Sequence, residues 1–182
     1  MHFTHISTLE LNKIYFFTAT IHRWKLLLQD SESKLLILNY LKRVTENGFV
    51  KVYAFVLMPN HIHLIWEPLK MNGKESIQTS FLKFTAHSFL KKLKADGRSK
   101  QYQVNTANKD HQIWKKHSLS IEIFSRRFAK QKLDYIHFNP VMGKWKLSKD
   151  DLDYFFSSAR FYETGLDEFG FLNNLYDVFD GE

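Results

Sequence analysis

Two runs of large apolar residues, 49–58 and 61–67, are separated only by Pro59 and Asn60. Each run has the length and the β-branched and aromatic content of a strand, and Pro-Asn is typical of a tight turn. Strands joined by so short a connection cannot be parallel, because a parallel crossover needs about a dozen residues or more. The sequence therefore predicts an antiparallel strand pair around which the rest of the chain must fold.

The remaining segments alternate between strand and helix patterns. Residues 96–110 are polar and indicate a loop, and the tail from 150 onward is expected to form one or two small helices. The order β-α-β-β-α-β-α favours an α+β sandwich, with helices on one face of a mainly antiparallel sheet. The patterns predict further strands over 13–24 and 111–117, and helices over 31–47 (capped by Ser31), 76–95 and 125–138.

Composition limits the class of protein. The chain has 182 residues and no cysteine, which suits a single domain and excludes disulfide scaffolds and Cys-ligated zinc sites. A cysteine-free chain also fits a reducing cytoplasm. The N-terminal residues lack the pattern of a signal peptide, and no apolar run is long enough to span a membrane. We therefore expect a cytoplasmic protein without a membrane partner.

Charge is unevenly distributed along the chain. All 26 lysines and arginines lie within residues 1–160, whereas six acidic residues and no basic ones follow from Phe161 onward. A body this basic suggests a polyanionic partner such as nucleic acid, and a lysine-rich solvated surface is the alternative. Trp114, Phe124 and Phe128 lie in the most basic stretch; exposed, they could stack on bases, but we expect Phe124 and Phe128 in the core. The basic candidates for DNA contact are Lys83, Lys91, Lys92, Lys115, Lys116, Arg126 and Arg127.

His61 and His63 lie one residue apart in the second of the paired strands. Side chains alternate between the two faces of a strand, so both imidazoles point to the same side. Two converging neutral imidazoles are a ready pair of ligands for a divalent cation, although a metal needs further donors. The alternative is that both are ordinary histidines at a strand edge, bonded to backbone or water.

The segment "KLDYIHFNPV", residues 132–141, offers further candidates. Tyr135 and Asn139 are four residues apart and share one helix face. A tyrosine hydroxyl can act as a covalent nucleophile, and a metal held by two imidazoles and an amide could polarise a phosphodiester as a Lewis acid. Considered alone, Tyr135 is one of eight tyrosines and fits a core or surface role equally well. His137 points away from the Tyr135 face and is expected to be structural.

Five segments in order, from "VLMPNHIHLIWEP" through "FLKFTAHSFLKKL", "IWKKHSLSIEIF" and "FAKQKLDYIHFNPV" to "YFFSSARFY", resemble the REP-associated tyrosine transposases. These are single-tyrosine transposases of the histidine–hydrophobic–histidine endonuclease superfamily. The resemblance covers about residues 13–162 and rests above all on "MPNHIHLI" together with "YIHFNPV". It divides the chain into a nuclease domain, residues 1–162, and an acidic tail, residues 163–182, packed on that domain or extending from it.

The resemblance implies a ferredoxin-like fold with the histidines on a central strand. It implies that Tyr135 attacks a single-stranded DNA phosphate beside a hairpin repeat, forming a 5′-phosphotyrosine link and a free 3′-hydroxyl. His61 and His63 match the pair that binds magnesium or manganese, and Asn139 lies where relatives place an amide-bearing third ligand, often glutamine. Some relatives build each active site from two subunits, which makes a homodimer an expected assembly. Such enzymes act on the bacterial chromosome, in the cytoplasm and nucleoid.

The sequence departs from the family after "NPV", where "MGKWKLSKDDLDYF" replaces a more basic run. The acidic tail has no counterpart in the family pattern; it could cover the DNA groove, contact a partner or pack on the body. One alternative function is a domesticated protein that binds hairpin nucleic acid without cutting it. Another is a water-using phosphodiesterase, for which Glu67 is the acidic residue nearest the histidines in sequence. The joint presence of both histidines, Tyr135 and Asn139 favours the transposase.

Overall fold

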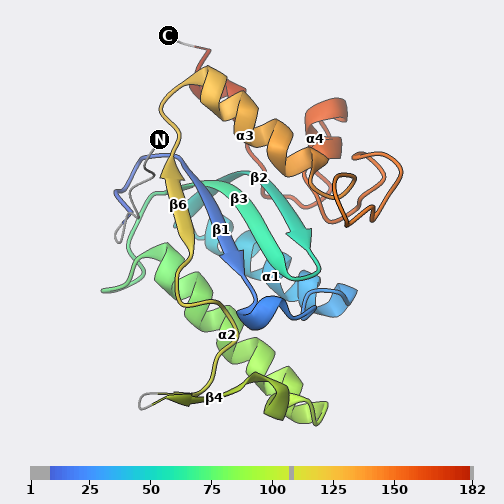
Figure 1. Ribbon diagram of the computed structural model, residues 1–182. Coiled ribbons are helices and arrows are strands. Elements are labelled where there is room, and N and C mark those ends of the chain that lie inside the picture. Colours follow the sequence, from blue (N-terminus) through green and yellow to red (C-terminus); the bar gives the residue numbers. More distant parts are fainter. Residues whose placement is uncertain (1–8, 107–108, 181–182) are drawn as a thin grey trace.

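The computed structural model describes residues 9–106 and 109–180. A four-stranded sheet forms its centre, and each neighbouring pair of strands in it is antiparallel (Figure 1). The strand order is β2-β3-β1-β6, which confirms the predicted α+β class and places the histidine strand inside the sheet. The four strands are β1 (Tyr15–Thr20), β2 (Val50–Met58), β3 (His61–Pro68) and β6 (Leu119–Glu122).

The helices form close to where apolar periodicity predicts them. The Asp30 side chain accepts a hydrogen bond from the Ser33 N–H, so Asp30 and not Ser31 caps the first helix. Ser76 and Ser125 cap the next two in the same way. The helices are α1 (Ser31–Glu46), α2 (Ile77–Ala95), α3 (Arg126–Phe138) and α4 (Ala159–Thr164), with short 3-10 turns η1 (His22–Trp24), η2 (Ser99–Tyr102) and η3 (Tyr176–Val178).

Helices cover both faces of the sheet, and the expectation that they share one face is wrong. Alternate residues of β1 point to opposite sides: Phe17 packs in a core with α1 and α2, whereas Phe16 packs in a second core with α3. Figure 1 shows α3 across the sheet from α1. Because β2 contributes apolar side chains to both cores, either side of the sheet can accept a helix. The second core includes Leu133 and Ile136, which hold α3 against the sheet.

The fourth sheet strand lies later in the chain than the sequence pattern predicts. Of the predicted strand 111–117, His111 ends the separate strand β5 and Trp114 forms an isolated bridge to Ile21, and the edge strand of the main sheet is β6. The strand is only four residues long and its one fully buried residue is the polar Ser120, so it carries little periodic signal. The predicted loop contains η2 and a small hairpin of β4 (Gln103–Thr106) and β5 (Lys109–His111).

The C-terminal segment returns across the sheet and enters both cores. Phe171 is buried in the core of α1 and α2, and Leu175 and Phe179 are buried in the core of α3. The Asn173 N–H donates to the Val52 carbonyl oxygen over 2.9 Å, which ties the segment to β2. Among its acidic side chains, Asp177 lies between these anchors, and Asp180, just after them, pairs with Arg126.

Candidate metal and nucleophile site

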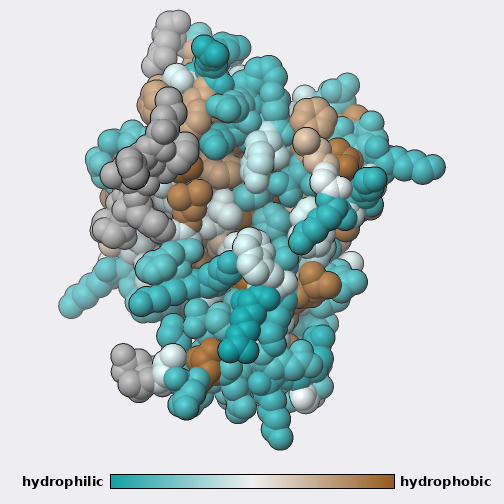
Figure 2. Space-filling model, in the orientation of Figure 1, coloured by the Kyte–Doolittle hydropathy of each residue, from teal (hydrophilic) through white to brown (hydrophobic). Residues whose placement is uncertain are grey.

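A pocket of about 780 Å³ opens on the face of the sheet that α3 partly covers. Strands β1, β3 and β6 form its floor, and α3 and the turn after it form one wall. Figure 2, in the orientation of Figure 1, shows a mostly hydrophilic surface with hydrophobic residues in small separate patches. The residues that matter for chemistry in this pocket are His61, His63, Tyr135, Asn139, Lys132, Thr18 and Trp24.

His61 and His63 converge in this pocket, as the strand alternation predicts. Their ring centroids are 4.9 Å apart, and the rings meet at 74°. His63 is stacked on Phe16 at 5.3 Å between centroids, which fixes its plane. His63 is buried, and its Nε2 has no hydrogen-bond partner among the residues that the structure describes. A buried, unpartnered imidazole nitrogen is costly unless a ligand completes it.

Neighbouring side chains bond the Nδ1 atoms of both histidines. The Nδ1 of His61 lies 2.7 Å from Asn60 Oδ1, a carbonyl oxygen that can only accept, so that nitrogen carries the proton. The Nδ1 of His63 lies 2.7 Å from Thr18 Oγ1, a hydroxyl that can donate or accept; when it accepts, this nitrogen too carries the proton. Each imidazole then keeps the Nε2 lone pair for a ligand, the arrangement in which metal-binding histidines are held by outer partners.

Burial favours the neutral form of both imidazoles. It lowers the pKa of His61 to about 4, against the opposing effect of a hydrogen bond with the Asn139 side chain. Burial also holds the pKa of His63 well below its ordinary value, assisted by the charges of His61 and Lys132. Neutral imidazoles are the form that binds metal, so the pair is ready for a cation at neutral pH.

Tyr135 projects from α3 over the histidine pair. Its ring centroid lies 5.1 Å from that of His63 and 5.9 Å from that of Phe16, with an edge-on approach to both. Tyr135 is 51% exposed, so a strand of DNA could reach its hydroxyl. The tertiary structure thus joins the tyrosine helix to the histidine strand, which the sequence pattern alone could not do.

Asn139 follows the last turn of α3 and lines the same pocket as His61. Two imidazole nitrogens and one amide oxygen fit a divalent cation whose remaining positions are taken by water or phosphate. Across residues 9–106 and 109–180, no group of three or more histidine, cysteine or acidic side chains comes together as a metal site. Asn139 is the residue with an amide oxygen that lines the pocket beside the histidine pair.

Glu67 and His137 have structural partners away from this chemistry. The Tyr53 hydroxyl donates to Glu67 over 2.5 Å, near the far end of β3. Glu67 does not line the histidine pocket, so it is not placed to act as the general base of a water-using phosphodiesterase. His137 is buried on the opposite side of α3 from Tyr135, with its Nε2 3.0 Å from Ser158 Oγ. His137 therefore has the structural role expected from its helix face.

Lys132 is a functional candidate that the sequence analysis did not single out. It lines the pocket one turn before Tyr135, and its Nζ lies 4.7 Å from the centre of the Phe16 ring and 6.0 Å from that of Tyr135. Burial lowers the pKa of its ammonium group, with no carboxylate of the described residues raising it. An unpaired positive charge beside Tyr135 is suited to a phosphate.

The basic residues proposed for DNA contact fall into separate groups. Lys83, Lys115 and Lys116 line a second pocket, of about 430 Å³, between α2 and residues 109–116. Lys115 connects this group to the histidine pocket, because its Nζ lies 3.7 Å from the centre of the Trp24 ring. Lys83 also pairs with Glu75. These three lysines form one basic surface that adjoins the candidate active site.

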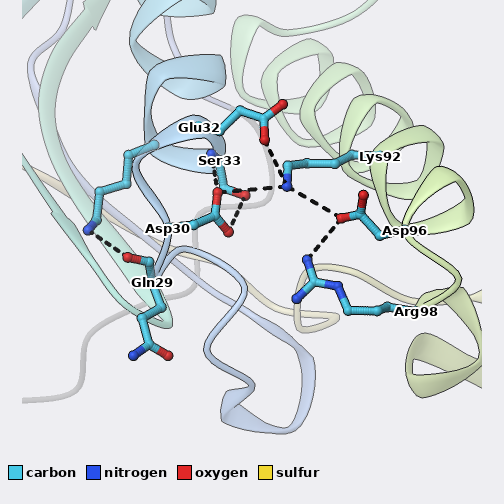
Figure 3. A network of polar contacts seen from close by, with 8 residues as sticks. Gln29, Asp30, Glu32, Ser33, Lys92, Asp96 and Arg98 are labelled. Atoms are coloured by element: carbon cyan, nitrogen blue, oxygen red, sulfur yellow. Dashed lines mark hydrogen bonds and ion pairs between the residues drawn. The ribbon is translucent and has the colours of Figure 1, made fainter.

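Lys92 is occupied by an acidic network (Figure 3). Asp96 in turn pairs with Arg98 at 3.2 Å. This neutralised arrangement ties α1 to the end of α2, so the structure does not bring Lys92 to the histidine pocket. The distances from Lys92 Nζ are 3.0 Å to Glu32, 3.5 Å to Asp96 and 3.8 Å to Asp30.

Lys91, Arg126 and Arg127 lie exposed, but outside the lining of both pockets. Arg126, in the first turn of α3, pairs with Asp180 of the acidic segment. Phe124 is 77% exposed and stacks on Phe128, so the expectation that Phe124 belongs to the core is wrong. The burial of β6 against β1 ends before Phe124, which leaves that ring in solvent.

No family model matches the sequence, and no curated protein matches it. Solved structures do include a match: the structure of a REP-associated tyrosine transposase bound to a REP hairpin, with a TM-score of 0.60. The alignment covers 94% of this chain and 92% of that chain at 20% sequence identity. This chain shares the transposase's fold. The expected ferredoxin-like α+β architecture is therefore confirmed, and the chemistry has to be argued from the residues.

Three residues around the histidine pair were not identified as part of the site by the sequence. Thr18 and Asn60 are hydrogen-bond partners of the histidines, and Trp24 is an exposed ring at the pocket edge. The register of β1 against β3, which pairs Thr18 with His63, could have identified Thr18 once the sheet order was known.

In the part of the chain that the structure describes, no helix has the length and apolarity needed to cross a membrane.

Proposed function

We propose that this protein is a divalent-metal-dependent, single-stranded DNA endonuclease and strand transferase that uses Tyr135 as its nucleophile. The observation that carries the proposal is the approach of Tyr135 to His63, 5.1 Å between ring centroids, where His63 Nε2 is buried and unpartnered. The shared fold with a transposase bound to a REP hairpin supports hairpin-flanked DNA as the substrate. We further propose that the activity resides in residues 1–162, with 163–182 as an added acidic segment.

The proposed reaction conserves the phosphodiester bond energy. The Tyr135 Oη attacks the scissile phosphorus, the bond from phosphorus to the 3′-oxygen breaks, and a 5′-phosphotyrosine forms. The phenolic proton passes to water, which the exposure of Tyr135 allows, and the departing 3′-oxygen takes up a proton from water. Attack by a 3′-hydroxyl on the phosphotyrosine reverses these changes and rejoins DNA.

The residues around Tyr135 have complementary roles in this proposal. His61, His63 and Asn139 would hold magnesium or manganese, which as a Lewis acid would polarise the phosphate when bound. Lys132 provides a fixed positive charge beside the nucleophile, and Thr18 and Asn60 hold the imidazoles in the ligating tautomer. In the cell we expect the protein to act on the bacterial chromosome, and a homodimer remains part of the proposal.

The test is the formation of a covalent protein–DNA adduct. The purified protein is incubated with single-stranded DNA oligonucleotides that carry hairpins, with manganese or with EDTA. Denaturing gels and mass spectrometry then reveal any attached DNA and the residue that carries it. We expect a manganese-dependent adduct at Tyr135.

Tyr135→Phe and Tyr176→Phe form a matched pair for this experiment. Both remove one phenol oxygen, but Tyr176 lies in the C-terminal segment, where its ring packs edge-on against Tyr162. Tyr135→Phe should abolish the adduct and keep DNA binding, whereas Tyr176→Phe should retain both. Cleavage that survives in Tyr135→Phe would contradict the nucleophile assignment. Binding without any adduct in the parent protein would favour a hairpin-binding protein that does not cut.

A further inference from the structure

Trp24 is an exposed tryptophan at the edge of the histidine pocket, and the proposed chemistry does not use it. Trp24 is 56% exposed, although tryptophan side chains are highly buried on average. It lines the same pocket as His61 and Tyr135. A solvent-exposed indole beside a candidate active site is available to a planar ligand that can stack on it.

The backbone that carries Trp24 is strained and firmly held. Arg23 and Trp24 both adopt left-handed conformations, with φ of 55° and 57°, which side chains with a β-carbon rarely do. The strain persists because the two residues just before it are tied to separate segments: the Ile21 N–H donates to Asn60 O at 2.8 Å, and the His22 N–H donates to Ile113 O at 2.7 Å. The exposure of Trp24 is therefore a fixed feature of the turn.

One amide connects Trp24 to the candidate metal ligands. The Oδ1 of Asn60 accepts from His61 Nδ1, and its Nδ2 donates to the Trp24 carbonyl oxygen over 3.3 Å. Asn60 itself is buried. The same side chain thus orients an imidazole and anchors the strained turn, so the indole keeps a defined position relative to the histidines.

The surroundings of Trp24 suit a charged, planar polymer. Lys115 Nζ lies 3.7 Å from the centre of the indole ring and covers one face, and Lys116 follows it in the adjoining basic pocket. The exposed remainder of the indole is available to a second planar group. Aromatic rings beside lysines are how proteins bind unpaired bases together with their phosphates.

We propose that Trp24 is a stacking platform for one unpaired nucleobase of the DNA strand that enters the histidine pocket, with Lys115 contacting the adjacent phosphate. The inference rests on the proposed function only for the choice of DNA as ligand. Stacking on Trp24 requires neither the metal nor the nucleophile. The platform fixes which nucleotide lies beside Tyr135, and so it contributes to the choice of cleavage position.

The test measures binding with cleavage switched off. Full-length protein carrying Tyr135→Phe is titrated in EDTA with fluorescein-labelled single-stranded oligodeoxyadenylate, and with an abasic deoxyribose-phosphate chain of equal length. Introducing Trp24→Ala should weaken binding of oligodeoxyadenylate by about 5- to 150-fold, the range for loss of one stacked base. It should leave binding of the abasic chain unchanged, because that chain has no base to stack. Trp24→Phe, which keeps an aromatic ring, should retain most of the affinity for oligodeoxyadenylate.

Two controls keep the result interpretable. Trp24→Gly removes the indole and relieves the left-handed strain, so it must reproduce the binding loss of Trp24→Ala in a well-folded protein, checked by thermal melting. Phe155→Ala removes an aromatic ring of 48% exposure that lines neither the basic pocket nor the histidine pocket, and it should bind as the parent does. If Trp24→Ala and Trp24→Gly bind oligodeoxyadenylate as tightly as the parent, the platform is overturned. It is also overturned if these two variants lose as much affinity for the abasic chain as for oligodeoxyadenylate.

The same experiments separate this inference from the proposed function. A manganese-dependent adduct at Tyr135, together with unchanged base-dependent binding in Trp24→Ala, would leave the nuclease proposal standing and overturn the platform. Base-dependent loss of binding in Trp24→Ala, without an adduct in the parent, would support the platform in a protein that binds DNA without cutting it.

Discussion

Thr18 Oγ1 lies 2.7 Å from His63 Nδ1, across the pairing of β1 with β3. The hydroxyl holds the side of the imidazole that faces away from the candidate cation position, and it leaves Nε2 as the buried, unpartnered atom. Thr18 therefore acts on the site through His63 and not by direct contact with a ligand. One residue that supports the proposed metal site therefore lies on β1, a strand that contains no histidine.

Thr18→Val removes the partner of His63 Nδ1 while keeping the shape of the side chain. We expect manganese affinity to fall by about 10- to 100-fold, the usual effect of losing an outer hydrogen bond to a metal-binding histidine. Calorimetric titration of EDTA-stripped protein measures it. Thr18→Ser keeps the hydroxyl and should bind manganese like the parent. Unchanged affinity in Thr18→Val would mean that the hydroxyl does not support a metal site.

Lys132→Met should slow adduct formation strongly and should have little effect on the stability of the fold. The ammonium group lies 6.0 Å from the centre of the Tyr135 ring and has no carboxylate partner among the described residues. Loss of one preorganised charge at a phosphate should reduce the cleavage rate by about 100-fold. Single-turnover kinetics measure the rate, and Lys132→Arg should recover much of it. Equal rates in Lys132→Met and the parent would remove Lys132 from the site.

Lys116 and Lys92 should differ in their contribution to DNA binding. Lys116 is exposed in the basic pocket beside Trp114, whereas Lys92 is paired with three carboxylates. Lys116→Ala should reduce the slope of log affinity against log salt by about 0.7, the value for one single-strand phosphate contact. Lys92→Ala should leave that slope unchanged. A larger change in Lys92→Ala than in Lys116→Ala would refute this placement of the DNA path.

The C-terminal segment should be needed for stability. Leu175 is completely buried against α3 and β2, so Leu175→Ala should lower the free energy of unfolding by about 2–5 kcal/mol. Urea denaturation measures this change. Val178, 44% exposed, provides the control, and Val178→Ala should shift stability by only about 0.5 kcal/mol.

Removal of residues 165–182 extends that prediction to the whole segment. The deletion strips Phe171, Leu175 and Phe179 from two cores, so we expect a protein that melts far below the parent or aggregates. A truncated protein with the parent's melting temperature and increased DNA binding would instead show that the segment serves only to cover the DNA surface.

Patterns within single segments predicted much of the architecture. The short Pro-Asn connection required the β2–β3 hairpin, and strand alternation put His61 and His63 on one face. Helical periodicity placed α1, α2 and α3 within one or two residues of their observed ends. These features depend on a few neighbouring residues, and so the sequence is enough to predict them. The edge strand was misplaced because a short run of four residues carries little periodic signal.

The sequence by itself determined the histidine pair, the helix that carries Tyr135 and Asn139, and the excess of positive charge. Only the tertiary structure decided that α3 lies on the histidine face, that Thr18 and Asn60 hold the imidazoles, and that Lys92 is neutralised while Lys132 is unpaired. The physical reason is that each of these contacts joins segments far apart in the chain. Their meeting depends on which apolar faces pack together, and a sheet that is apolar on both sides leaves that choice open until the whole chain is folded.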